Sequence, residues 1–237
     1  MHKSSTTLLE LARERVLVMD GAMGTSIQAR GLSVKDFGKH PGCNEYLVRS
    51  RPDVIAGIHR EFLAAGAQII QTNSFSGSTL ALAEHGLDSE CSRLNREAAE
   101  LARACADEWS SEDKPCFVGA SVGPGARLAT LGQIDYDSLY RAYLRQLEGL
   151  VAGGVDLIMV ETVQDLLQAK AAIAAARDVM GSKPLPLYLS VTAETNGTLL
   201  SGPDLEVVAV VAEALDVDFL GLNCATGPAA MDEQLAA

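Results

Sequence analysis

The sequence predicts a parallel β/α fold from two observations. Short apolar runs that do not alternate with polar residues take turns with longer segments of helical spacing, and such runs are typical of strands buried on both faces of a parallel sheet. In addition, one unit occurs three times, near residues 63–70, 150–158 and 214–220, as a helix end, a tight turn and an apolar strand. The 237 residues suffice for one domain of this class, and we treat 1–237 as that domain.

The first elements follow from apolar runs and helix-ending residues. A strand is predicted over Val16–Met19 and a second one over 68–73. Between them, a helix should begin at Pro52 and end at Gly66, because proline suits the first helical turn and glycine ends helices. The segment 31–50 shows no period and is predicted to be an inserted loop.

The remaining elements continue the alternation to the end of the chain. Helices are predicted over about 92–108, 164–180 and 204–215, and strands over 116–121, 156–162, 187–192 and 218–222. A further helix carries Leu139, Tyr143, Leu147 and Leu150 on one face and ends at Gly153-Gly154. This makes six strand–helix steps, the last helix beginning at Pro228. A doubly wound sheet is complete with six strands, whereas a barrel needs eight, and periodicity alone leaves both architectures open.

Composition excludes several classes of function. No apolar run approaches the roughly 20 residues of a membrane helix, and the first residues lack the apolar segment of a signal peptide, so we expect a cytoplasmic protein without a membrane partner. The net charge of −12 argues against nucleic acid as a partner. The five cysteines are odd in number and widely spaced, which predicts neither a disulfide framework nor a complete zinc site within the chain.

Polar residues follow every predicted strand, at the edge where ligands bind in either architecture. We call this edge the mouth; its residues are Asp20-Gly21, Thr72-Asn73, Ser121, Glu161-Thr162, Thr192, Glu194 and Asn223-Cys224. Contact with solvent is enough to explain Thr192, Glu194 and Ser121. Asp20 and Glu161 directly follow apolar runs, which places them at the inner edge of the mouth. Two such carboxylates suit binding of an α-amino group or general acid–base chemistry.

Two further segments at the mouth have a chemical interpretation. Residues 20–25, Asp-Gly-Ala-Met-Gly-Thr, lack the lysine and the glycine spacing of a phosphate loop, but their small side chains let backbone N–H groups approach a carboxylate. Cys224 ends the last predicted strand, in a loop broken by Gly227-Pro228. Its thiol is either buried packing, the common state of free cysteine, or a metal ligand or nucleophile.

Several motifs together resemble the homocysteine S-methyltransferase family, and their order fits nearly the whole chain. They are Val18–Thr25, Gln71–Phe75, Val160–Thr162, Leu200–Gly202 and Gly221–Pro228. The resemblance implies a (β/α)8 barrel of the TIM type, of which about the first six β/α units are present here. It also implies that Asp20 and Glu161 hold the amino group of homocysteine, with the Gly21 backbone and Thr72 near its carboxylate. Asn73 is expected as a further substrate-binding residue, and Cys224 as the first of three zinc-binding cysteines.

The resemblance also implies a reaction. Zinc would keep the homocysteine thiol in its nucleophilic thiolate form, and methylcobalamin, presented by a cobalamin-binding module beside a folate-binding one, would donate the methyl group that gives methionine. A stand-alone enzyme using S-methylmethionine or betaine is an alternative, although aromatic residues, at 5%, are few for a betaine cage.

A third reading is a catalytically incomplete fragment. The two adjacent cysteines that complete the family's zinc site, in a Gly-Gly-Cys-Cys motif, do not occur in this sequence. We therefore expect the isolated chain to be inactive and to bind zinc weakly or not at all.

Overall fold

The computed structural model describes residues 7–236, and its centre is one five-stranded parallel sheet. The strands are β1 (Ile69–Gln71), β2 (Phe117–Val122), β3 (Leu157–Val163), β4 (Leu187–Val191) and β5 (Phe219–Leu222). Each strand pairs in parallel with the next one along the chain, so the spatial order is β1-β2-β3-β4-β5.

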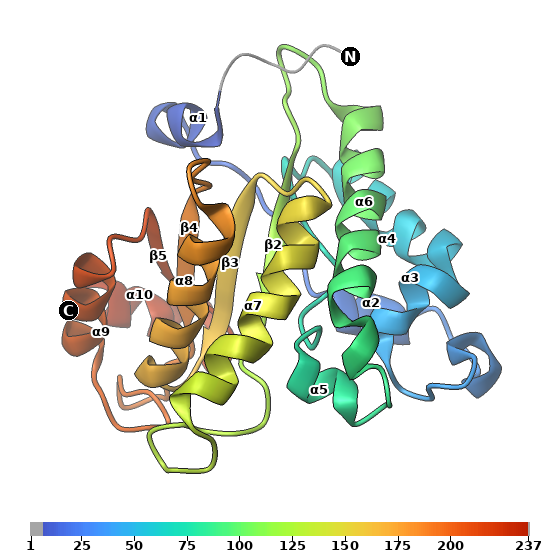
Figure 1. Ribbon diagram of the computed structural model, residues 1–237. Coiled ribbons are helices and arrows are strands. Elements are labelled where there is room, and N and C mark those ends of the chain that lie inside the picture. Colours follow the sequence, from blue (N-terminus) through green and yellow to red (C-terminus); the bar gives the residue numbers. More distant parts are fainter. Residues whose placement is uncertain (1–6, 237) are drawn as a thin grey trace.

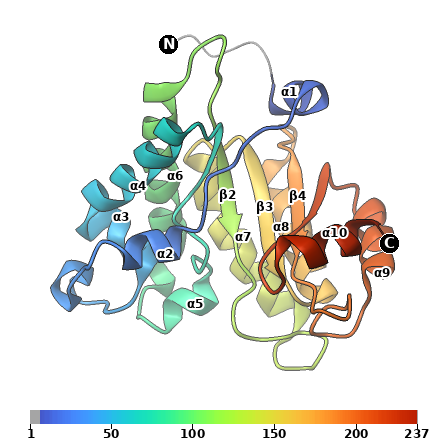
Figure 2. The ribbon, with the colours of Figure 1, turned by 180° about the vertical axis from the view of Figure 1, so that it is seen from behind.

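This strand order decides between the two architectures that periodicity left open. A doubly wound sheet reverses its strand order at a switch point, whereas consecutive strands of a (β/α)8 barrel follow one another without reversal. The observed order has no reversal. Helices α6, α7 and α8 lie on one face of the sheet (Figure 1), and the view from behind shows β2, β3 and β4 in front of α7 and α8 (Figure 2). The sheet is therefore part of a barrel wall.

The long helices agree with the sequence pattern, whereas several short ones were not predicted. Their bounds are α1 (Leu8–Glu14), α2 (Met23–Gln28), α3 (Leu47–Ser50), α4 (Pro52–Ala65), α5 (Thr79–Ala83), α6 (Cys91–Trp109), α7 (Tyr136–Ala152), α8 (Leu166–Met180), α9 (Leu205–Ala214) and α10 (Pro228–Ala236). Short 3-10 turns cover Val34–Phe37, Asn44–Tyr46 and Asp88–Glu90. As predicted, α4 begins at Pro52 and ends at Gly66, whose φ of 113° is the left-handed conformation that glycine adopts without strain.

One prediction about the first part of the chain was wrong, and short helices there were missed. The strand predicted over Val16–Met19 forms only a single bridge, between Met19 and Ile69, because its backbone hydrogen bonds to the β1 segment are confined to residues 18–20. Val16 and Val18 are 88% and 55% exposed, so their apolar character reflects no packing within the described chain. Conversely, α2, α5 and, within the predicted loop 31–50, α3 were not predicted, because helices of four to six residues are too short to show a helical period.

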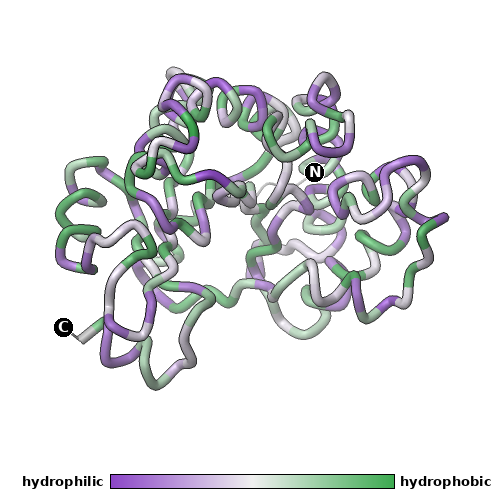
Figure 3. Tube along the Cα trace, turned by 90° about the horizontal axis from the view of Figure 1, so that it is seen from below, coloured by the Kyte–Doolittle hydropathy of each residue, from purple (hydrophilic) through white to green (hydrophobic). Residues whose placement is uncertain are grey.

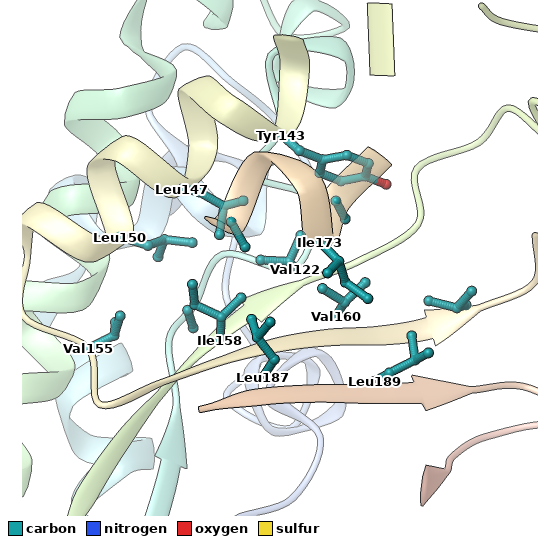
Figure 4. Close-up of a cluster of buried hydrophobic side chains, with 14 of the residues drawn as sticks. Val122, Tyr143, Leu147, Leu150, Val155, Ile158, Val160, Ile173, Leu187 and Leu189 are labelled. Carbon is teal, nitrogen blue, oxygen red and sulfur yellow. The ribbon is translucent and has the colours of Figure 1, made fainter. Parts of the chain in front are cut away.

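Both faces of the sheet carry a hydrophobic core. On the helix side, Figure 4 shows α7 residues Tyr143, Leu147 and Leu150 packed over Ile158 and Val160 of β3. The opposite face holds a smaller cluster, made of Leu8, Leu11, Ile69, Phe117, Leu157 and Met159. Burial on both sides explains why the strands read as continuous apolar runs.

Helix α1 supplies two residues of the smaller cluster and lies at the amino-terminal ends of the strands (Figure 1). The polar residues of the mouth stand at the opposite, carboxyl-terminal ends. Seen from that side, hydrophobic and hydrophilic stretches alternate along the trace (Figure 3), as strand–helix units with buried and exposed faces require. Within residues 7–236, none of the helices has the length and hydrophobicity to cross a membrane.

Candidate functional site

Asp20 is the first carboxyl group of the mouth, and one of its oxygens is satisfied. The backbone N–H of Gln71 donates to Oδ2 at 2.9 Å, which ties Asp20 to the end of β1. The other oxygen, Oδ1, is buried and has no hydrogen-bond partner among the described residues. Burial raises the pKa of Asp20 to about 7, with a further contribution from the charge of Glu161, and the Gln71 hydrogen bond opposes the rise. A buried acceptor is thus left open beside a second carboxyl group.

Glu161 is that second carboxyl group, at the end of β3. Ser121 Oγ donates to its Oε1 at 2.6 Å, and burial raises its pKa above the ordinary value although this hydrogen bond opposes the effect. The strand carries a β-bulge here: Val160 pairs with Leu189 but Val163 pairs with Val191, so β3 holds one extra residue. Bulges of this kind re-aim side chains and are frequent next to active sites.

Thr72 and Asn73 follow β1 and are almost fully buried. Thr72 Oγ1 shares a hydrogen bond with Ser74 Oγ at 2.6 Å and accepts one from the backbone N–H of Ser121 at 3.0 Å. Asn73 Nδ2 donates to the carbonyl of Asn44 at 2.7 Å. Thr72 therefore lies in the same polar group as Ser121, the residue that contacts Glu161, whereas the Asn73 amide fixes the inserted loop.

Gly21 directly follows Asp20 and lies against an aromatic ring. A Cβ at this position would lie 3.1 Å from Cζ of Phe62, so only a residue without a side chain fits here without displacing Phe62. Gly21 is exposed, and its backbone is accessible from solvent beside the Asp20 carboxyl group.

Cys224 is the one exposed cysteine within the described chain; the other four are buried. The backbone at Cys224 and Ala225 is left-handed, with φ of 60° and 45°. Asn223 Nδ2 donates to Cys224 Sγ at 3.3 Å. Burial raises the pKa of the thiols of Cys43, Cys91, Cys105 and Cys116, as expected for cysteines that only pack. The alternative of a buried packing thiol therefore fails for Cys224.

The described residues do not complete a metal site. Over residues 7–236, no three His, Cys, Asp or Glu side chains gather closely enough to hold a metal ion. Cys224 alone offers a sulfur donor at the mouth, because the other cysteines lie in hydrophobic packing. A structural zinc site needs four ligands and a catalytic one usually takes three from the protein, so this set fits a zinc ion only in part.

A cavity of about 580 Å³ lies beside the mouth but is a separate feature. It is lined by residues of the 42–45 segment, α5, α7 and the β1–α5 and β2–α7 connections, among them Phe75, Arg127 and Tyr143. Asp20, Glu161 and Cys224 do not line it. The candidate site is therefore the group of strand-end residues and not this cavity.

The sequence did not reveal that neutral polar side chains connect the strand ends through hydrogen bonds. Solvent contact was expected to explain Ser121 and Thr192, yet they are only 3% and 4% exposed. Ser121 donates to Glu161, and Thr192 donates to the Asn223 carbonyl. Asn223 was noted only for its position, yet its side chain joins three strand ends. The one sequence feature that could have indicated this role is the position of Asn223 directly before Cys224.

Comparison with known proteins identifies the family. The family model described as homocysteine S-methyltransferase matches residues 17–237. The chain belongs to this family. Curated relatives include the methionine synthases of Mycobacterium tuberculosis and Mycobacterium leprae, each 42% identical over 236 residues. These matches cover 99% of this chain and 20% of each relative, so the chain spans about a fifth of the length of the curated relatives it matches.

Solved structures support the fold. The homocysteine methyltransferase MmuM from Escherichia coli matches in its metallated form with a TM-score of 0.72 and 24% identity, covering 90% of this chain and 76% of that one. Its apo form matches with a TM-score of 0.73 and 24% identity, covering 96% and 79%. This likeness confirms the partial (β/α)8 barrel expected from the sequence motifs.

Proposed function

We propose that the chain is the homocysteine-binding domain of a methionine synthase and that Asp20 and Glu161 bind the amino group of homocysteine. The observation that carries this proposal is the pair of half-buried carboxyl groups, one of which has a buried oxygen without a partner among the described residues. An ammonium group between them would supply the missing donor. Its positive charge would also lower the pKa of both acids and keep them ionised.

The other end of the amino acid is assigned to the neighbouring strand ends. Gly21 and Ala22 are exposed next to Asp20, and their backbone N–H groups suit a carboxylate. Thr72 and Asn73 are assigned to the carboxylate end of the amino acid as well. Thr72 is held there by the backbone N–H of Ser121, and Asn73 holds the inserted loop beside the mouth. With both ends held, the homocysteine sulfur would extend toward Cys224.

We further propose that Cys224 is one of the thiolate ligands of a zinc ion. Cys224 is exposed at a strand end, and it is the one cysteine of the described residues whose thiol lies at the mouth, which supports this role. Since the described residues supply one sulfur, the further ligands have to come from groups outside them, and we expect little zinc binding by this chain alone.

The methyl donor is proposed to be methylcobalamin, carried by another module or protein together with a folate-binding one. The support is the 42% identity to methionine synthases across 99% of the chain. Turnover assays of the full-length protein with methylcobalamin and with S-methylmethionine as alternative donors test this point. Methylation of homocysteine by S-methylmethionine alone would contradict it.

Binding of homocysteine can be tested on this chain directly. Titration of L-homocysteine, under reducing conditions, into ¹⁵N-labelled protein should shift amide resonances near Asp20 and Glu161. The variant Glu161→Gln should weaken binding by about tenfold or more, because it removes one of two charges that face the ammonium group. The matched control is Glu194→Gln, at another strand end whose exposed side chain has no role in the proposed site. Equal weakening in both variants, or none in either, would refute the assignment.

A further inference from the structure

The side chain of Asn223 takes part in four hydrogen bonds at the ends of the strands. Its Oδ1 accepts from the backbone N–H of Thr162 at 3.1 Å and from Ser190 Oγ at 2.7 Å. Its Nδ2 donates to Thr162 Oγ1 at 2.8 Å and to Cys224 Sγ at 3.3 Å. One side chain thus connects the ends of β3, β4 and β5.

The contact with Thr162 stabilises a strained conformation. Thr162 has a φ of 58°, which is unfavourable for a β-branched residue. It lies inside the β3 bulge, between Val160 and Val163, and directly follows Glu161. Residues in such conformations persist only where their surroundings hold them. Asn223 holds Thr162 at two points, its N–H and its hydroxyl, and both bonds span 61 residues of sequence.

The same residue fixes the loop that carries the thiol. The backbone of Asn223 is itself anchored, since its N–H donates to the Val191 carbonyl at 3.1 Å and its carbonyl accepts from Thr192 Oγ1 at 3.1 Å. Cys224 follows at once in a left-handed conformation, with its sulfur against the Asn223 amide. The position of the thiol is therefore set relative to β3 and β4, and not only by its own loop.

We infer that Asn223 is a positioning residue that holds the thiol of Cys224 at a fixed place relative to the carboxylate of Glu161. In the proposed function, Glu161 binds the amino end of homocysteine and Cys224 lies at its sulfur end, so this inference rests on that function. The Asn223 amide links the two ends through Thr162 and would match their separation to the length of the amino acid.

Two measurements on the whole chain test the inference. The first needs no ligand: hydrogen exchange of the Thr162 amide, followed by NMR, should become about fivefold faster or more in Asn223→Ala, because the bond to Oδ1 is lost. Amides elsewhere in β3 and β5 should keep their rates. Asn223→Leu, of similar volume, serves if the alanine variant does not fold. Asn223→Asp should restore slow exchange, since a carboxylate accepts from the Thr162 N–H, the Thr162 hydroxyl and Ser190.

The second measurement reports on position. L-methionine, which iodoacetamide leaves largely intact at neutral pH, should slow alkylation of Cys224 in the wild type by about threefold or more at saturation, and peptide mass spectrometry identifies the modified residue. In Asn223→Ala this protection should disappear although methionine still binds. Ser190→Ala, which removes one partner of the same oxygen but leaves both Thr162 contacts, should keep it.

The outcomes separate this inference from the proposed function. Unchanged Thr162 exchange in Asn223→Ala, or protection that survives while methionine stays bound, would overturn the positioning role. Uniformly faster exchange across β3 to β5 would also overturn it, since that is the signature of a general loss of stability. Failure of the wild type to bind methionine or homocysteine would refute the proposed function instead, and the exchange experiment would still decide the role of Asn223.

Discussion

Replacing Asp20 with asparagine should make the folded chain more stable at pH 8 while abolishing its proposed ligand binding. Burial raises the pKa of Asp20 from its ordinary value of 3.8 to about 7. The folded state therefore keeps this proton over a range in which the unfolded state has lost it, and stability falls as the pH rises from about 4 to 7. Asparagine carries no charge at any pH and retains an oxygen that accepts from the Gln71 N–H.

The size of the effect follows from the two pKa values. They differ by a little over three pH units, and each unit corresponds to about 1.4 kcal/mol, so the buried charge destabilises the fold by at most about 4 kcal/mol above pH 7. Relaxation and water entry reduce such penalties, and we expect Asp20→Asn to gain about 2 kcal/mol at pH 8 and about 0.5 kcal/mol or less at pH 4.

Urea denaturation at the two pH values measures this difference, and equal m-values would show that the unfolding reaction is unchanged. Glu194→Gln is the control, because Glu194 is exposed and its substitution should leave stability within about 0.5 kcal/mol at both pH values. A variant that is less stable than the wild type at pH 8, or a gain that is the same at pH 4, would refute the reasoning.

Three further predictions concern other parts of the chain. Burial lowers the pKa of His59 from 6.5 to about 4, so the folded state binds fewer protons than the unfolded state between these pH values and loses stability as the pH falls through them. His59→Leu should remove this loss of stability in urea titrations at pH 7 and 4.5. An unchanged loss in the variant would contradict the prediction. A Cβ at Gly221 would overlap the Tyr188 hydroxyl, so Gly221→Ala should cost about 1–3 kcal/mol. Adding Tyr188→Phe should recover part of this cost, and a double variant as unstable as the single one would point to another cause. After dialysis against a mild chelator, the chain should retain far less than one equivalent of zinc, and near-stoichiometric retention would contradict the incomplete ligand set.

Sequence reasoning reached the strands and the residues at their ends because these depend on local patterns. An apolar run that ends at Glu161 places that carboxyl group at the mouth whatever the rest of the fold does. The same logic failed for Val16–Met19, since an apolar run becomes a strand only where neighbouring strands pair along its length, and here one bridge forms.

The interactions that define the site could not be predicted, because they join residues far apart in the sequence. The bonds between Asn223 and Thr162 span 61 residues of sequence. The left-handed conformation of Thr162 could not be predicted either, because glycine is the residue that normally indicates such a conformation. The pKa of Asp20 likewise depends on burial by elements from several parts of the chain. Residue types indicated which groups meet at the mouth, and only the folded chain shows which of them contact one another.

The central claim is that Asp20 and Glu161 recognise an α-amino group. It is tested most directly by NMR titration of the ¹⁵N-labelled chain with L-methionine and with 4-(methylthio)butanoate, which has the same carboxylate and thioether but no amino group. The proposed site predicts that methionine binds and shifts the resonances of Asp20, Gly21 and Glu161, and that the analogue binds at least about tenfold more weakly. Equal affinity for the two compounds would contradict the account.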